Sequence, residues 1–124
     1  MRGYTVSTVA LALDVPFKWI DNTLSHYRVR GVVQERQGVA RRLTSEAVVV
    51  LETALQLIRS LEIPTALALR IAQKLAESEE PRYSIGACEV RLDLDQVRAR
   101  VAIRLAYAVE ISPVPRRGRP PKGR

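Results

Sequence analysis

Residues 4–44 have the sequence YTVSTVALALDVPFKWIDNTLSHYRVRGVVQERQGVARRLT, and this stretch decides the fold of the first half of the chain. Apolar side chains at helical spacing in residues 4–13 predict a short helix that is capped near Ser7. The following DVP, residues 14–16, breaks that pattern. A second helix is expected from its proline or from Phe17, because proline is favoured in the first turn of a helix. The stretch therefore begins with two helices joined by a tight turn.

The remainder of this stretch predicts a two-stranded hairpin. Val32 and Val33 precede a polar segment, and Val39 and Leu43 follow it. These apolar residues indicate two strands, with a turn near residues 36–38 between them. Thr44 or Ser45 then caps a strongly apolar helix over residues 45–61, which carries an acidic residue in its first turn. The predicted order is thus helix, turn, helix, hairpin, helix.

The second half of the chain predicts two more helices and one strand. A helix is expected to start at Thr65, and alternating apolar and polar side chains over residues 83–94 indicate a strand. No partner strand is evident nearby, so pairing with a second copy across a two-fold axis is expected. Asp93, followed three residues later by Gln96, resembles a capping box for a last helix. The predicted fold class is mainly α with a small amount of β.

The middle of the chain predicts packing rather than chemistry. Val48, Val49 and Val50 cannot all be buried on one face of a helix, so this helix is either covered on several sides or paired with another subunit. Cys88 lies in the strand pattern, where a buried small hydrophobic residue is expected. With one His, one Cys and no glycine-rich phosphate loop, the sequence predicts no metal site, no cofactor and no enzymatic activity.

Positive charge is concentrated at the two ends of the chain, whose 124 residues have a net charge of +7. Residues 1–44 hold seven Lys and Arg against three Asp and Glu, and residues 113–124 hold five against none. Residues 45–82 hold four against six, and residues 83–112 hold four against four. This pattern favours two contact regions for an acidic partner, most often nucleic acid and sometimes an anionic membrane. No signal peptide or membrane span is evident, so a cytoplasmic protein is expected.

The last twelve residues, PVPRRGRPPKGR, cannot bury a core and are expected to be disordered when free. Their centre, Arg117-Gly118-Arg119-Pro120, resembles the AT-hook of high-mobility-group A proteins, which implies binding in the narrow minor groove of A·T-rich DNA. Gly118 lets the backbone approach the groove floor, and Pro120 keeps the chain extended. The residues expected to contact DNA are Arg116, Arg117, Gly118, Arg119, Pro120, Lys122 and Arg124. The alternative is a generic basic tail that holds any polyanion.

Residues 4–60 resemble the winged helix-turn-helix of the mercury-resistance regulator (MerR) family. The matching residues are Tyr4-Thr5-Val6, Ala10 and Val15, then Gly31-Val32-Val33 and Gly38-Val39-Ala40-Arg41-Arg42-Leu43-Thr44 at the start and end of the wing. The resemblance implies that the second helix enters the major groove of DNA and that the hairpin, the wing, grips the backbone. It implies a DNA-binding domain over residues 1–62.

Polar residues of this domain are the candidate DNA contacts. Those of the second helix suit base edges or phosphates, since asparagine pairs well with adenine, and the arginines suit phosphate oxygens. Trp19 is expected to pack against the wing or the first helix. Arg41 and Arg42 point to opposite faces of a strand, so only one of them need meet DNA. The full set is Lys18, Trp19, Asn22, Ser25, His26, Arg28, Arg30, Arg36, Gln37, Arg41 and Arg42. The alternative is that some of these are only solvated.

The leading functional hypothesis is a transcriptional regulator, a repressor, that prefers A·T-rich double-stranded DNA and associates with the nucleoid. A homodimer is expected, in which residues 63–112 serve dimerisation or partner binding and residues 113–124 form the tail. One alternative is an architectural or recombination-accessory DNA-binding protein. Another is an antitoxin-like module in which residues 45–112 bind a protein partner and the head autoregulates transcription.

Overall fold

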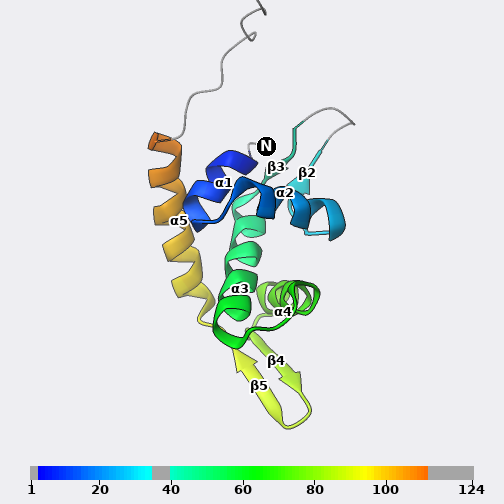
Figure 1. The fold of residues 1–124 in the computed structure, drawn as a ribbon. Coiled ribbons are helices and arrows are strands. Elements are labelled where there is room, and N and C mark those ends of the chain that lie inside the picture. The colour runs from blue at the N-terminus through cyan, green and yellow to red at the C-terminus, as the bar shows by residue number, and fades with distance from the viewer. Residues whose placement is uncertain (1–2, 35–39, 112–124) are drawn as a thin grey trace, which may run out of the picture.

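The computed structural model describes residues 3–34 and 40–111. Over these ranges the chain is mainly helical, as the sequence predicts, and it has two small antiparallel sheets (Figure 1). The helices are α1 (Val6–Leu13), α2 (Phe17–His26), α3 (Ser45–Leu61), α4 (Thr65–Glu77) and α5 (Leu94–Ile111). The strands are β1 (Tyr4–Thr5), β2 (Val32–Val33), β3 (Arg42–Leu43), β4 (Arg82–Ile85) and β5 (Cys88–Arg91).

The first helix begins later than the sequence predicts. Tyr4 and Thr5 form β1, and α1 starts only at Val6. Thr5, not Ser7, is the N-cap, because its Oγ1 accepts a hydrogen bond from the Thr8 N–H at 3.1 Å. The backbone of Thr5 is extended, so this one residue both ends the strand and caps the helix. The cap therefore lies two residues before Ser7, the residue near which the sequence predicts it.

The predicted hairpin is confirmed, and it carries a third strand that the sequence did not predict. β2 and β3 pair antiparallel with Val33 opposite Arg42, and β1 pairs with the other edge of β3 with Thr5 opposite Arg42. The strand order is β1-β3-β2. The sheet therefore fastens the start of α1 to the hairpin. The turn predicted near residues 36–38 lies outside the described ranges.

α3 is the central helix, with α4 on one side and α5 on the other (Figure 1). The Thr44 side chain caps it by accepting a hydrogen bond from the Ala47 N–H at 3.1 Å. Val48, Val49 and Val50 are all buried, and none is more than 4% exposed. Helices of the same chain thus cover α3 on several sides, which is the first of the two explanations that the sequence left open for these valines.

α5 packs against both α1 and α3 and joins them in one core. It is capped as predicted, since the Asp93 carboxylate accepts a hydrogen bond from the Gln96 N–H at 3.1 Å. The buried apolar residues from Val6 to Ala108 form a single cluster. That cluster draws on residues from both sides of residue 62, where the sequence predicts a domain boundary.

Two ion pairs link α5 to α3 at the border of this core. Arg98 donates hydrogen bonds to both carboxylate oxygens of Glu46, at 3.0 and 3.2 Å, and these bonds raise the pKa of Arg98 above its usual value. Arg104 lies 4.0 Å from Glu52, whose side chain is 5% exposed. Gln56 also donates a hydrogen bond to Glu52 at 2.8 Å. Oε2 of the buried carboxylate thus accepts a hydrogen bond from an amide, while Oε1 faces the Arg104 charge at 4.0 Å without a hydrogen bond from any described residue.

Residues 83–94 do not form the single strand that the sequence predicts. β4 and β5 pair antiparallel within the chain, with Tyr83 opposite Val90. Gly86, between them, has a φ of +58°, which suits a two-residue hairpin turn. Alternation of apolar and polar residues resumes after the turn, so the pattern alone does not reveal it. The partner strand lies in the same chain, so the pairing with a second copy that the sequence favoured without deciding it is not needed to supply this strand.

The β4–β5 hairpin projects from the helical body at the end opposite to the β1-β3-β2 sheet (Figure 1). Cys88, the first residue of β5, is exposed. The expectation of a buried cysteine is therefore wrong, because Cys88 lies beside the turn of a hairpin whose tip extends beyond the helices that could cover it.

Candidate nucleic-acid interface

The turn between α1 and α2 places these helices at a fixed angle. Asp14 adopts the left-handed conformation, with a φ of 56°, and its N–H bonds to the carbonyl oxygens at the end of α1. The Val15 N–H donates to the Ala10 carbonyl at 3.1 Å. Pro16 is the N-cap of α2, and the Trp19 N–H donates to its carbonyl at 3.0 Å. The three-residue break predicted from the sequence is confirmed as a tight turn between two helices.

α2 presents one face to the core and the opposite face to solvent. Ile20 is fully buried and Thr23 is 4% exposed. Trp19 is partly buried against the core, which agrees with its expected packing role. Phe17 is 51% exposed because it begins the helix and lines a hollow beside the hairpin. The exposed polar residues of α2 are Lys18, Asn22, Ser25 and His26.

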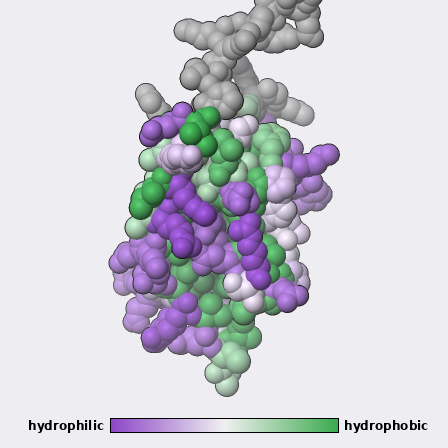
Figure 2. Space-filling model, turned by 60° about the vertical axis from the view of Figure 1, so that its left-hand side comes forward, coloured by the Kyte–Doolittle hydropathy of each residue, from purple (hydrophilic) through white to green (hydrophobic). Residues whose placement is uncertain are grey.

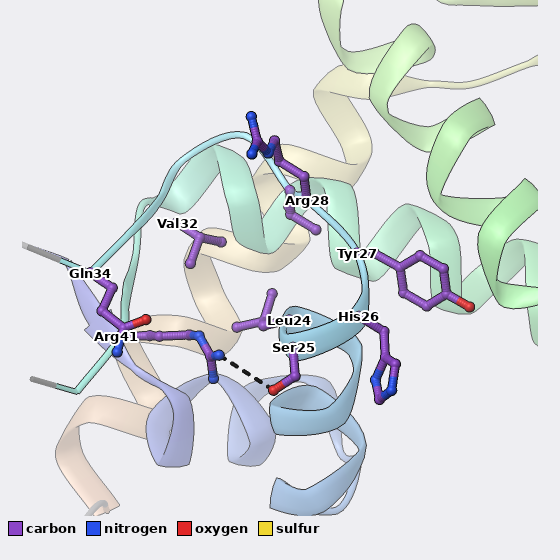
Figure 3. Close-up of a pocket in the computed structure, with 9 residues that line it drawn as sticks. Leu24, Ser25, His26, Tyr27, Arg28, Val32, Gln34 and Arg41 are labelled. Atoms are coloured by element: carbon purple, nitrogen blue, oxygen red, sulfur yellow. Dashed lines mark hydrogen bonds between the residues drawn. The ribbon is translucent and has the colours of Figure 1, made fainter. Parts of the chain in front are cut away.

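Arg41 connects the hairpin to α2. Its Nη1 lies 3.1 Å from Asp21 Oδ1, and its Nη2 donates to Ser25 Oγ at 3.3 Å (Figure 3). Ser25 in turn donates to the Asp21 carbonyl oxygen at 2.9 Å. The Arg41 side chain is only 24% exposed, so this contact is partly shielded from water. Arg41 therefore pairs with the Asp21 carboxylate and links α2 to the hairpin.

Two hollows flank the Arg41 bridge, and Gln34 and Arg41 line both of them. The larger, of about 500 Å³, lies between the end of α2 and the hairpin (Figure 3). It is lined by Leu24, Ser25, His26, Tyr27, Arg28, Val29, Val32, Gln34 and Arg41. The smaller, of about 240 Å³, is lined by Thr5, Val6, Ser7, Phe17, Asp21, Gln34, Ala40 and Arg41. Together they form a concave strip along α2, whose larger hollow is polar and basic and whose smaller hollow is mainly apolar.

The loop after α2 is held by α4. The Gln73 side chain accepts from the Arg30 N–H at 3.1 Å and donates to the Arg28 carbonyl at 3.2 Å. The side chain of Arg28 is exposed at the rim of the larger hollow (Figure 3). Arg30 instead lies 3.8 Å from Glu77 of α4, so its guanidinium is drawn away from α2. Of these two predicted phosphate contacts, the structure brings only Arg28 to the concave strip.

Arg42, on the central strand β3, is exposed, while its neighbour Arg41 turns to α2. The two side chains thus lie in different surroundings, as their neighbouring positions on a strand predict. Two further residues belong to this region but were not predicted, Gln34 in the hairpin and Gln73 in α4. Gln73 carries no local signal because its partners lie more than forty positions earlier. The predicted contacts Arg36 and Gln37, and those of the tail from Arg116 to Arg124, lie outside the described ranges.

Comparison of the chain with known protein-family models, curated proteins and solved structures found no match. Within the part of the chain that the structure describes, no helix is long and apolar enough to cross a membrane.

Proposed function

We propose that the chain is a winged helix-turn-helix protein that binds double-stranded DNA and regulates transcription as a repressor. The observation that carries this proposal is the Arg41 bridge, which joins the exposed polar face of α2 to the hairpin of the β1-β3-β2 sheet. In such an arrangement α2 is the helix that enters the major groove, and the hairpin is the wing that contacts the adjacent backbone.

The chemistry of the α2 face suits base edges. Lys18, Asn22 and His26 recur every four residues and are exposed, so they form one stripe along the helix. The major groove is about 12 Å wide and accepts one α-helix. Asn22 offers the donor and acceptor pair that adenine requires, and Lys18 suits guanine or a phosphate.

The charge around this face suits the DNA backbone. Residues 3–34 and 40–44 carry five Lys and Arg and two Asp. Arg41 pairs with Asp21, and Arg28 and Arg42 remain exposed. We assign these exposed arginines to phosphate oxygens, where they supply affinity and register rather than sequence preference.

The basic tail supplies a second, auxiliary contact in this proposal. Residues 113–124 hold five basic and no acidic residues around Arg117-Gly118-Arg119-Pro120. A slim extended chain with this centre suits the narrow, strongly negative minor groove of A·T-rich DNA. The tail then adds affinity and A·T preference, while α2 and the wing choose the site.

Binding of fluorescently labelled duplexes, one A·T-rich and one G·C-rich, tests the proposal by anisotropy over a range of salt concentrations. We expect salt-dependent binding that favours the A·T-rich duplex, because each phosphate contact contributes a slope of about −0.9 in log K against log salt. Deletion of residues 113–124 should reduce both the slope and the A·T preference. Equal affinity and slope for the truncated chain would contradict the role of the tail, and no binding by the full chain would refute the proposal.

Footprinting on genomic fragments tests the regulatory part of the proposal. A repressor protects a few defined sites, since discrimination against each wrong base pair is worth about 1–3 kcal/mol. Broad coverage accompanied by DNA bending would instead indicate an architectural protein.

A further inference from the structure

The outer face of α5 carries an apolar stripe that nothing in the described chain covers. Ile103 is 72% exposed, Tyr107 is 64% exposed and Ile111 is 50% exposed, and these residues recur every four positions on one face of the helix. Leu105, on the opposite face, is 2% exposed in the core. Figure 2, in which the α5 side comes forward, shows hydrophobic side chains among hydrophilic ones on this face. Monomeric proteins rarely leave such neighbouring large apolar residues exposed.

Small residues accompany this stripe. Ala99, Ala102 and Ala106 are exposed beside the large side chains. Small side chains let another helix approach closely, since the distance between packed helix axes depends on the residues at the contact. The outer face of α5 therefore has both the large protruding side chains and the small side chains between them that close helix packing requires.

The charges on α5 indicate which partner fits. Arg98 and Arg104 are engaged with Glu46 and Glu52 of α3. Arg100 and Glu110 are exposed and make no hydrogen bond or ion pair with any residue in the described ranges. Of these two residues, Arg100 lies toward the start of the helix and Glu110 near its end. A partner must offer the opposite order of charge together with an apolar stripe.

We propose that this partner is a second copy of the chain. The two α5 helices pack antiparallel about a two-fold axis, and each contributes its outer face, which is the face opposite Leu105. Antiparallel pairing places Ile103 of each copy at the level of the other's Tyr107. It also places Arg100 at the level of the other's Glu110, so both free charges gain a partner. The opposed helix dipoles add a favourable contribution. The interface forms without DNA and does not depend on the proposed function.

Analytical ultracentrifugation of the full chain over a wide concentration range, without DNA, tests this interface. We expect a dimer of the wild-type chain and a monomer of the Ile103→Glu variant, because a carboxylate would be buried without a partner. Leu61→Glu is the matched control, since Leu61 is 58% exposed but lies at the end of α3; it should leave the dimer unchanged. Circular dichroism checks that both variants keep their helices. A monomeric wild-type chain at the highest concentration, or a dimer that survives Ile103→Glu, would overturn the proposal.

Charge reversal tests the antiparallel order. Arg100→Glu or Glu110→Arg alone sets like charges opposite each other at two symmetric places, and each should weaken the dimer by about tenfold or more. The double variant R100E/E110R restores opposite charges and should recover the wild-type dissociation constant. If the double variant is as weak as the single ones, the antiparallel arrangement is wrong.

Discussion

Arg41 illustrates how one side chain couples two elements of the candidate interface. Its two terminal nitrogens reach two different acceptors on α2, the Asp21 carboxylate and the Ser25 hydroxyl. Lysine offers a single point of charge and cannot reproduce this pair of contacts. Arg41→Ala and Arg41→Lys should therefore both weaken DNA binding, while the A·T preference of the tail stays unchanged. Anisotropy titrations of the two variants check this expectation.

Arg42→Ala is the control for Arg41, since Arg42 is exposed and adjacent in sequence. It removes the phosphate contact proposed for Arg42 and should lower the salt slope by about one without moving α2. Arg41→Ala additionally leaves Asp21 unpaired beside the DNA, so it should cost more affinity than Arg42→Ala. Equal losses of affinity in the two variants would mean that the bridge has no positioning role.

Gly31 is a position at which only glycine fits. Its φ is +91°, and a Cβ there would collide with Oγ1 of Thr44, the cap of α3. Gly31→Ala should lower the free energy of unfolding by about 1–3 kcal/mol, measured by urea denaturation. Gly86→Ala is the comparison, because Gly86 also has a positive φ but nothing lies within 4 Å of the added carbon. A smaller loss is expected there, and equal losses would contradict the collision.

At the scale of elements, two residues near the start of α1, Thr5 and Ser7, can be compared as its N-cap. Thr5→Ala removes the hydroxyl that accepts from the Thr8 N–H, and it should cost about 1 kcal/mol in the free energy of unfolding. Ser7 is exposed in the first turn, so Ser7→Ala should change that energy by less than about 0.5 kcal/mol. Thermal or urea denaturation of the two variants compares the caps directly. A larger effect at Ser7 would show that the helix starts later than Val6.

Elements with local signals could be predicted from the sequence, and elements without them could not. The turn before α2 and the cap at Asp93 depend on residues within four positions, and both were predicted correctly. β1 was missed because two residues gain strand geometry only by pairing with β3, far along the chain. In the candidate site, the exposed face of α2 follows from periodicity. The contacts of Arg41 and Gln73 depend on tertiary packing, which periodicity does not encode.

At the scale of the whole molecule, α5 completes the core that supports α1. Leu105, 2% exposed, belongs to the cluster that also includes residues of α1, α3 and α4. Leu105→Ala should lower the free energy of unfolding by about 2–5 kcal/mol, because the cavity adds to the lost burial. Leu61→Ala, at a position 58% exposed, should cost less than about 0.5 kcal/mol.

Urea denaturation of the wild-type chain and of the Leu105→Ala variant also tests whether residues 3–34 and 40–111 unfold together. One shared core predicts a single transition, followed identically by Trp19 fluorescence and by helical circular dichroism. Two separate transitions would indicate that the parts on either side of residue 62 are independent domains.

The central claim is that α2 and the wing, and not only the basic tail, contact DNA. Amide chemical-shift mapping of the full isotope-labelled chain with an A·T-rich duplex tests it most directly, because each residue reports separately. The proposal predicts shifts along α2 at Lys18, Asn22 and His26, and in the hairpin at Gln34 and Arg42, with little change at the remote β4–β5 hairpin. Shifts confined to residues 113–124 would contradict the claim and leave the chain with a DNA-binding tail alone.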